Sequence, residues 1–174
     1  MVETAKYEVI LKEGAFETRR YMEMLLATIK GTSDRFQTLF RYISGSNISK
    51  SKIAMTSPVI SSEKIAMTSP VLSDDEAMSF VVPSEFSPDT VPEPKDPHVS
   101  IEVVPERIVA TVRFKGFASK DSVKKETDKL LEWIEMKGYV LKGTPFLMQY
   151  NPPFVPGFMR RNEIGVEIEP HNVG

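Results

Sequence analysis

The residues best placed to bind a small molecule form an apolar, aromatic row with a cation beside it. The row follows the i, i+3, i+4, i+7 spacing of one face of an amphipathic helix and consists of Phe36, Leu39, Phe40 and Ile43. Such a face must contact something apolar, which is either a sheet or a ligand lodged between helix and sheet. Arg41 follows Phe40 directly and could reach from the edge of this helix to an acidic ligand.

A second group of apolar side chains belongs to the loop of residues 150–159. Three prolines hold this loop extended, and Phe154 and Phe158 give it apolar surface that needs cover from the fold or from a ligand. The adjacent Arg160 and Arg161 could pair bidentately with ligand carboxylates, or they could lock the loop to a nearby Asp or Glu.

No motif marks a catalytic or metal site. The sequence contains no Gly-rich phosphate loop, no His-Glu-x-x-His and no nucleophile elbow, and it has no cysteine. The two histidines, His98 and His171, have no neighbouring motif that would orient their rings. We therefore expect a protein that is not an enzyme. A hydrolase with a buried Glu is the alternative, and a carboxyl pKa raised towards neutrality would identify it.

Composition excludes several classes of partner. The 22 basic and 24 acidic residues nearly cancel, which argues against a dedicated nucleic-acid binder. The longest apolar run is far shorter than the roughly 20 residues of a membrane-spanning helix, so we expect no membrane partner. Residues 1–6 lack the basic-then-apolar layout of a secretion signal. The sequence thus predicts a cytoplasmic protein, with a monomer as the default state.

Two predicted helices have recognisable ends. The first covers the apolar row, with N-cap candidates at residues 32–34 and a glycine, Gly45, where a C′ residue belongs. The second begins at Ser119 or Asp121 and ends at Gly138.

The predicted strands flank these helices. Alternating or β-branched residues predict strands at 7–11, 16–29, 78–82, 99–103, 108–114, 139–141, 146–150 and 163–168, with a turn at Pro105-Glu106. Two identical octapeptides, Lys52–Val59 and Lys64–Val71, are joined by a predicted hairpin turn at residues 60–63. Each places Ile and Met on a common face, suited to core filling or to a flat ligand.

The order of elements indicates an internal duplication within a single domain of residues 1–174. The pseudo-repeats cover about 6–82 and 98–170. Dense prolines make residues 83–97 a stiff, extended crossover between them. Neither half has enough strands to cover its helix alone, which argues against two independent domains.

Several segments, in this order, resemble the SOUL haem-binding protein family, and the likeness covers nearly the whole chain. They are Phe36–Asn47, the two octapeptides, Met78–Glu85, Pro92–Glu106, and Tyr150–Pro153 with Arg160–Glu163. The resemblance implies an α+β fold of duplicated β-α-β-β repeats, which form a twisted, barrel-like antiparallel sheet flanked by two helices.

The resemblance also implies tetrapyrrole binding in a surface cleft beside the first helix, without a universally required axial histidine. Carried onto this chain, the pocket candidates are Phe36, Leu39, Phe40 and Arg41, to which we add Phe154 and Phe158 from the loop. Ser33 and Val155 occupy positions where a further cation would help to hold propionates.

The leading hypothesis is a non-catalytic buffer or carrier whose cofactor is non-covalently bound haem or another porphyrin-like small molecule. The alternative is an effector-binding module for other amphipathic molecules, because the fold also resembles the effector-binding domains of bacterial multidrug-responsive regulators.

Overall fold

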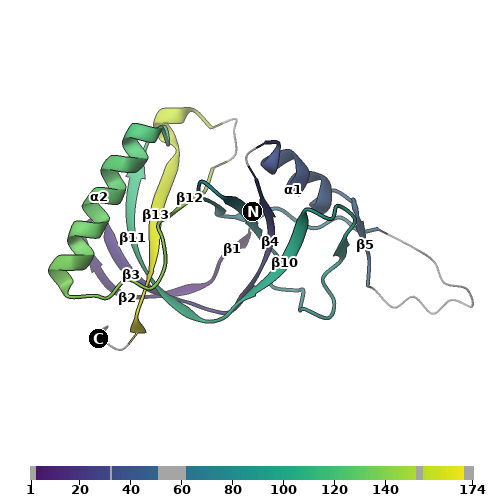
Figure 1. Ribbon diagram of the computed structural model, residues 1–174, viewed down its shortest axis with the longest axis horizontal. Coiled ribbons are helices and arrows are strands. Elements are labelled where there is room, and N and C mark those ends of the chain that lie inside the picture. The colour runs from purple at the N-terminus through teal and green to yellow at the C-terminus, as the bar shows by residue number, and fades with distance from the viewer. Residues whose placement is uncertain (1–2, 32, 51–61, 152–154, 171–174) are drawn as a thin grey trace, which may run out of the picture.

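The computed structural model describes residues 3–31, 33–50, 62–151 and 155–170 of the 174-residue chain. One strongly curved antiparallel sheet carries two helices, α1 (Arg35–Ile43) and α2 (Lys120–Lys137), and a short 3-10 helix, η1 (Gly157–Met159) (Figure 1). The sheet strands, in the order in which they lie side by side, are β10 (Val99–Val104), β4 (Met24–Lys30), β8 (Ala77–Val81), β7 (Val71–Ser73), β12 (Phe146–Gln149), β13 (Arg161–Ile168), β11 (Arg107–Lys115), β3 (Phe16–Tyr21) and β2 (Tyr7–Glu13). Two short pairs lie outside it: β1 (Glu3–Thr4) with β6 (Thr68–Ser69), and β5 (Asn47–Ile48) with β9 (Glu93–Pro94).

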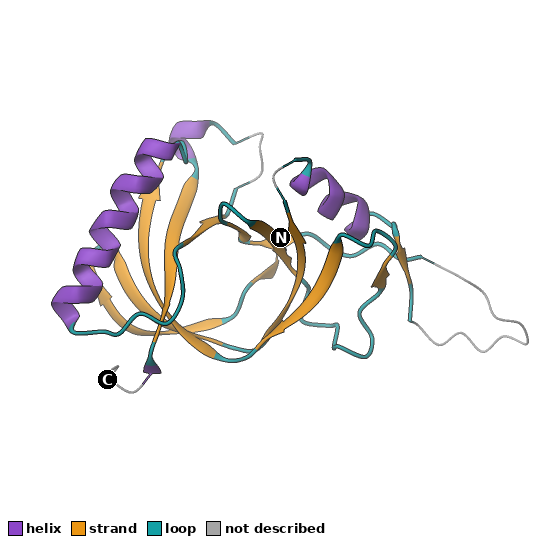
Figure 2. Cartoon of the chain, in the orientation of Figure 1, coloured by secondary structure: helices purple, strands orange, loops and turns teal. Residues whose placement is uncertain are grey.

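This architecture confirms the expected α+β class, with a half-barrel sheet and two flanking helices (Figure 2). The elements β4, α1, β7 and β8 of one half occupy places that correspond to β11, α2, β12 and β13 of the other. Strands β7 and β12 therefore meet in the middle of the sheet. The duplication itself, with repeat boundaries near 6–82 and 98–170, stays a prediction.

A long, bent ribbon joins the two halves of the sheet. Strand β10 pairs with β4, and β11 pairs with β3, in one unbroken register: Val104 lies opposite Met24, and Arg107 lies opposite Tyr21. The predicted single strand at 16–29 is thus two strands, because the ribbon bends at residues 22–23. The predicted turn at residues 105–106 is the matching bend in the partner strand, and the chain does not reverse there.

The two helices begin differently, although both have polar residues at the N-terminus. Ser119 caps α2, because its hydroxyl accepts a hydrogen bond from the Ser122 N–H at 3.2 Å. Asp34 precedes α1 in a left-handed conformation, with φ of 53°, and its side chain makes no capping hydrogen bond. The predicted side-chain cap at 32–34 is therefore wrong for Asp34, whereas the predicted C′ glycines Gly45 and Gly138 both have positive φ.

The different caps predict different responses to substitution. Ser119→Ala should lower the free energy of unfolding by about 1 kcal/mol, the usual loss for an N-cap hydroxyl. Asp34→Gly should leave it unchanged or raise it, because glycine adopts positive φ without strain and no cap is lost. Urea unfolding followed by circular dichroism would measure both. An equal loss for the two variants would contradict the assigned caps.

Each helix covers one half of the same sheet face. Under α1 the core contains Leu25, Ala27, Ile29, Phe80 and Val99, and under α2 it contains Ile108, Ala110, Val112, Ile164 and Val166. A third apolar cluster, with Leu26, Leu72, Val81 and Met148, occupies the opposite face, which we call the helix-free face. The alternation of these strands sends neighbouring residues to opposite faces.

Two further predictions concern residues 139–141 and the octapeptides. Residues 139–141 form no strand, because only an isolated bridge links Leu141 to Ile168 in the described structure. In the second octapeptide, the buried Ile65 and the partly buried Met67 pack into the core under α1. The first octapeptide and most of the predicted hairpin turn lie outside the described residues.

Candidate functional site

A groove of about 600 Å³ lies between α1 and α2, and we call it the interhelical groove. Its floor is formed by β12 and β13, its α1 wall by Arg35, and its α2 wall by Lys120, Val123 and Thr127. Among the described residues, the lining consists of Arg35, Ser73, Asp74, Asp75, Glu76, Ala118, Lys120, Val123, Thr127, Thr144, Pro145, Phe146, Leu147 and Ile164.

The groove follows from how the helices cover the sheet. Helix α1 packs over β4, β8 and β10, whereas α2 packs over β11 and β13. The middle strands β7 and β12 lie between these two packed regions. Their helix-side residues, such as Leu147, are therefore left to line an open channel.

The predicted residues of α1 separate into a buried and an accessible group. Leu39 is fully buried in the core, so the surface cleft predicted for it is already filled there. Phe36 is partly buried, with its ring edge-on to Phe80 at a centroid distance of 5.3 Å. Phe40 is 46% exposed and stacks on Phe36, with ring centroids 6.2 Å apart.

Phe36 and Phe40 lie on the β8 side of α1, beside the groove but outside its lining. Phe80, which Phe36 contacts, pairs with Val71 of β7, the strand next to the groove floor. Tyr42 lies on the other side of α1, where its hydroxyl donates a hydrogen bond to the Pro92 carbonyl at 2.6 Å. The structure therefore leaves Phe40, rather than Leu39, available to a ligand.

Arg35 lines the groove, whereas the predicted Arg41 does not. Arg35 was not named in the sequence analysis. The Arg35 guanidinium donates to the Asp74 carbonyl at 2.9 Å, which holds it at the groove. Arg41 is exposed and donates to Thr38 Oγ1 at 3.1 Å. Lys120, at the start of α2, is the second cation that sequence reasoning missed. Arg35 precedes Leu39 by four residues, and this i, i+4 spacing was the signal in the sequence that Arg35 lies on the same face of α1.

The loop residues lie towards α2 rather than α1. Phe158 is 73% exposed in η1. The Gly116 N–H donates to the Arg160 carbonyl at 3.0 Å, which ties this loop to the end of β11, next to the start of α2. A ligand that touched both Phe40 and Phe158 would therefore have to cross the groove. Phe154 lies outside the described residues.

One end of the groove is acidic. The β7–β8 turn supplies Asp74, Asp75 and Glu76. The Asp74 carboxylate accepts hydrogen bonds from the backbone N–H groups of Glu76 and Ala77, both at 2.8 Å. Because this carboxylate is already hydrogen-bonded by the turn, the exposed Asp75 and Glu76 present most of the free negative charge.

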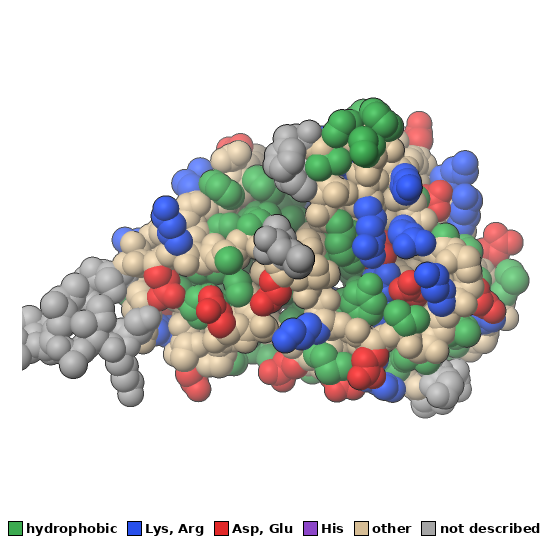
Figure 3. Space-filling model, turned by 180° about the vertical axis from the view of Figure 1, so that it is seen from behind, with side chains coloured by type: hydrophobic (Ala, Val, Ile, Leu, Met, Phe, Trp, Pro, Cys, Tyr) green, Lys and Arg blue, Asp and Glu red, His purple; other side chains and the backbone are tan. Residues whose placement is uncertain are grey.

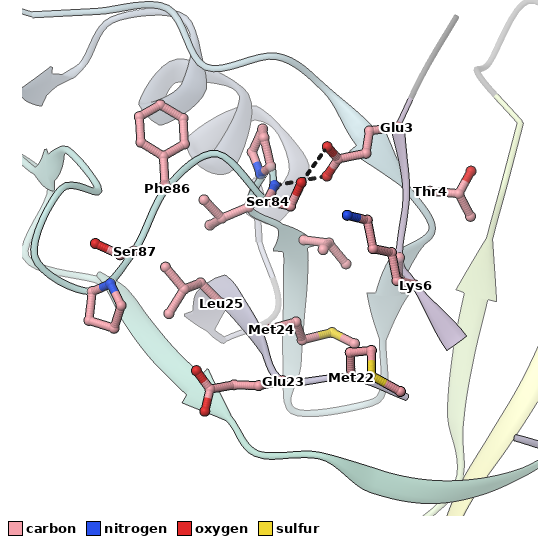
Figure 4. Close-up of a pocket in the computed structure, with 15 residues that line it drawn as sticks. Glu3, Thr4, Lys6, Met22, Glu23, Met24, Leu25, Ser84, Phe86 and Ser87 are labelled. Carbon is pink, nitrogen blue, oxygen red and sulfur yellow. Dashed lines mark hydrogen bonds between the residues drawn. The ribbon is translucent and has the colours of Figure 1, made fainter. Parts of the chain in front are cut away.

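A smaller pocket of about 260 Å³ lies between the N-terminal segment and the crossover (Figure 4). Glu3 accepts hydrogen bonds from the backbone N–H and the hydroxyl of Ser84, both at 2.9 Å, and so closes one side. Met22, Met24 and Phe86 supply apolar wall. Its volume is less than half that of the interhelical groove, so it is a poorer match to a macrocycle.

The helix-free face contains a buried ion pair between residues 144 positions apart in sequence. Arg19 donates to both carboxylate oxygens of Glu163, at 2.7 and 2.5 Å, and the two side chains are 2% and 0% exposed. Glu163 also accepts hydrogen bonds from the Tyr150 hydroxyl at 2.5 Å and from Arg161 at 3.1 Å. Of the two roles predicted for Arg161, the structure shows pairing with a carboxylate of the protein, but Glu163 lies on the same strand, β13, and Tyr150 is the loop residue that bonds to it.

This environment determines how Glu163 titrates. Burial alone would raise the pKa of Glu163, but hydrogen bonds and charge from Arg19, assisted by Tyr150 and Arg161, outweigh burial and lower it. Glu163 is the buried Glu that the hydrolase alternative required, yet its pKa shift has the opposite sign to that criterion. Its four hydrogen bonds also leave it little capacity to accept a proton from a substrate.

Potential iron ligands lie away from the groove. His98 is exposed and its Nδ1 lies 3.0 Å from Asp96 Oδ1, while His171 lies outside the described residues. Of the residues that the structure describes, no His, Met or Tyr lines the groove. Among the described residues, no cluster of three or more His, Asp or Glu side chains is arranged to hold a metal ion.

A curved antiparallel sheet with an open, partly apolar groove between two helices defines a class of α+β protein suited to hold a small molecule. Within that class, the family model for "SOUL heme-binding protein" matches residues 2–167, and this chain belongs to that family. A comparison with curated proteins gives no match. No helix in the described part of the chain is long and apolar enough to cross a membrane.

Solved structures share the fold at low sequence identity. The C-terminal domain of EcmrR is 13% identical, with a TM-score of 0.58 over 94% of this chain and 98% of that chain. A hydrolase from Listeria innocua is 12% identical, with a TM-score of 0.58 over 91% of this chain and 94% of that one. EcmrR in its DNA complex is 13% identical, with a TM-score of 0.53 over 88% of this chain and 57% of that one.

Proposed function

We propose that this protein binds haem or a related tetrapyrrole in the interhelical groove and acts as a cytoplasmic buffer or carrier without catalysis. The observation that carries the proposal is a groove of about 600 Å³ with an apolar floor and one cation on each wall, Arg35 and Lys120. A flat macrocycle would lie over Leu147 and against Val123, and its propionates would meet these cations. Phe40 and Phe158 would extend the contact at the two sides.

The expected affinity comes from contact area. Covering a few hundred Å² of apolar surface gains on the order of 10 kcal/mol, and association consumes about half of that. Micromolar binding therefore requires no iron ligand, in agreement with a groove lining that offers no His or Met.

This reasoning predicts that iron adds little to binding. Metal-free protoporphyrin should bind with an affinity within about threefold of that for haem, a difference below 1 kcal/mol. Titrations followed by the Soret band for haem, and by fluorescence for protoporphyrin, would measure both. An affinity at least tenfold higher for haem would instead assign a metal bond, and a Soret band unchanged from free haem would contradict the proposal.

Phe40 provides a mutational test of the contact proposed at the edge of the groove. Phe40→Ser should weaken haem binding about three- to tenfold, because a half-exposed aromatic ring loses its contact with the macrocycle. The matched control is Met136→Ser, which removes a 76% exposed apolar side chain at the far end of α2. Equal affinities for the Phe40 variant and the wild type would place the site elsewhere.

The acidic end of the groove favours a second candidate function, the binding of cationic amphipathic molecules. Asp75 and Glu76 would attract such a ligand, whereas they would repel propionates. In a fluorescent-dye screen, this candidate predicts tight binding of lipophilic cations that Asp75→Asn/Glu76→Gln weakens. Tighter haem binding by that same variant would instead support the tetrapyrrole proposal.

A further inference from the structure

One end of the molecule exposes three large apolar side chains that lie close together, and we call them the apolar tip. They are Phe117, Phe158 and Met159, with exposed fractions of 68%, 73% and 59%. Figure 3 shows a group of hydrophobic side chains at the top of the molecule, at the position that η1 and the start of α2 occupy in Figure 1. Apolar groups of this size are usually buried in a monomeric protein, so their exposure calls for an explanation.

Contacts between two segments fix the position of the apolar tip. Gly157 lies against the ring of Phe117, where a Cβ atom would come within 2.2 Å of two ring carbons. The Ser122 hydroxyl donates to the Phe117 carbonyl at 2.7 Å. The bond from the Gly116 N–H to the Arg160 carbonyl closes the same end of the loop. Two segments about 40 residues apart are thus tied together at this end.

The surroundings of the tip are basic. Arg113 and Lys115 at the end of β11 and Lys120 at the start of α2 are exposed, and none has an ion-pair partner within the described residues. In Figure 3, Lys and Arg side chains gather beside the hydrophobic group. Asp121 is the acidic residue in the first turn of α2, and Glu163 is occupied by Arg19.

An apolar tip beside several cations matches the two layers of an anionic bilayer surface. Burial of apolar side chains at the boundary between headgroups and acyl chains is favourable, and Lys and Arg are attracted by the negative surface potential. A protein interface of ordinary size buries about 800 Å² on each partner and has a polar rim. Three side chains flanked mainly by positive charge fit a membrane surface better than such an interface.

We propose that the apolar tip is a peripheral docking site for anionic lipid bilayers. Phe117, Phe158 and Met159 enter the headgroup region, while Arg113, Lys115 and Lys120 contact lipid phosphates and carboxylates. The expectation of no membrane partner rested on the lack of a spanning segment, and peripheral docking needs none. The apolar tip shares Phe158 and Lys120 with the proposed tetrapyrrole site, whereas Phe117, Met159 and Lys115 belong to the tip alone.

Sedimentation with phosphatidylcholine vesicles, with and without phosphatidylserine, tests this proposal on the full chain. The wild type should bind the phosphatidylserine vesicles and lose binding as salt is raised, because the attraction is screened. Phe117→Ser/Met159→Ser should weaken binding at least tenfold, and Lys115→Glu should weaken binding to the anionic vesicles. The matched control, Met136→Ser, removes an exposed apolar side chain at the opposite end of α2 and should bind vesicles as the wild type does.

Absence of binding, binding that salt does not change, or an equal loss in the control would overturn the proposal. If light scattering shows a wild-type dimer that Phe117→Ser/Met159→Ser dissociates, the tip is instead a contact between copies of this chain. Since that variant keeps the groove residues, it should bind haem as the wild type does. If the wild type does not bind haem, the tetrapyrrole proposal fails but the vesicle result still stands. The two proposals can therefore fail independently.

Discussion

Arg19→Met is expected to lower the free energy of unfolding by about 3 to 5 kcal/mol, because it leaves the carboxylate of Glu163 buried without its main partner. Glu163 is 0% exposed and has no route to water that would replace the two hydrogen bonds from Arg19. For a chain of this length the loss corresponds to a melting temperature lower by roughly 10 °C. Urea unfolding at neutral pH would measure it.

A double variant distinguishes a paired charge from ordinary packing. Arg19→Met/Glu163→Gln removes both charges of this pair and leaves Glu17, which also bonds to Arg19 at 2.7 Å, in place. The loss of the Glu17 contact is common to Arg19→Met and the double variant, so the double variant should still cost clearly less than the sum of the single costs, with a coupling of about 1 to 3 kcal/mol. Arg20→Met is a matched control, since Arg20 is 41% exposed and its contacts to Glu8 and Glu106 are 4.0 and 3.3 Å long. Strictly additive costs would mean that the pair contributes nothing specific.

The same pair predicts how stability depends on pH. Because the pKa of Glu163 is lowered in the folded protein, its stabilising contribution is complete above the ordinary glutamate pKa of about 4.3 and is lost as pH falls below that value. In Arg19→Met the unpaired, buried carboxylate of Glu163 destabilises the folded protein, and its protonation removes this cost as pH falls. The variant should therefore lose less stability than the wild type between pH 6 and pH 4. Parallel pH curves would contradict this account.

Thr127→Trp is expected to abolish most haem binding, with an affinity at least thirtyfold lower, or about 2 kcal/mol. Thr127 lies on the α2 wall, and an indole at this position would fill the space above the β12 floor. The effect should exceed that of Phe40→Ser, because it removes the volume of the site rather than one contact at its edge. The Soret titration described above measures it.

Lys125→Trp is the matched control for this substitution. Lys125 is exposed on α2 and does not line the groove, so the same indole there should leave haem affinity unchanged. Equal losses in the two variants would indicate a general effect on the helix. Unchanged affinity in Thr127→Trp would exclude the interhelical groove as the binding site and direct attention to the pocket between Glu3 and Phe86.

Local pattern was sufficient for most individual elements. The i, i+3, i+4, i+7 spacing located α1, and the alternation of Ile164, Val166 and Ile168 located β13 with its buried face. These predictions succeed because periodic burial is encoded within a few consecutive residues. The bend at residues 22–23 was missed, since strand-forming residues continue through it and only the partner strand shows where the ribbon turns.

The candidate site depended more on long-range packing. Sequence spacing identified Phe36 and Phe40 as ligand candidates, but it treated Leu39 in the same way, because all three share one helix face. The packing of α1 on β4 and β8 decided that Leu39 is in the core while Phe40 is 46% exposed. Arg35 and Lys120 face each other across the groove only because the sheet brings the two halves of the chain together.

By itself, the sequence determined the two helices, the class of fold and the family, because helix ends, alternation and short motifs are local properties. Only the tertiary structure decided that Arg19 meets Glu163, that β7 and β12 are left between the helices, and that three apolar side chains stand exposed at one end. Each of these depends on strand order. Strand order is set by the total burial and hydrogen bonding of the whole sheet, which no single segment specifies.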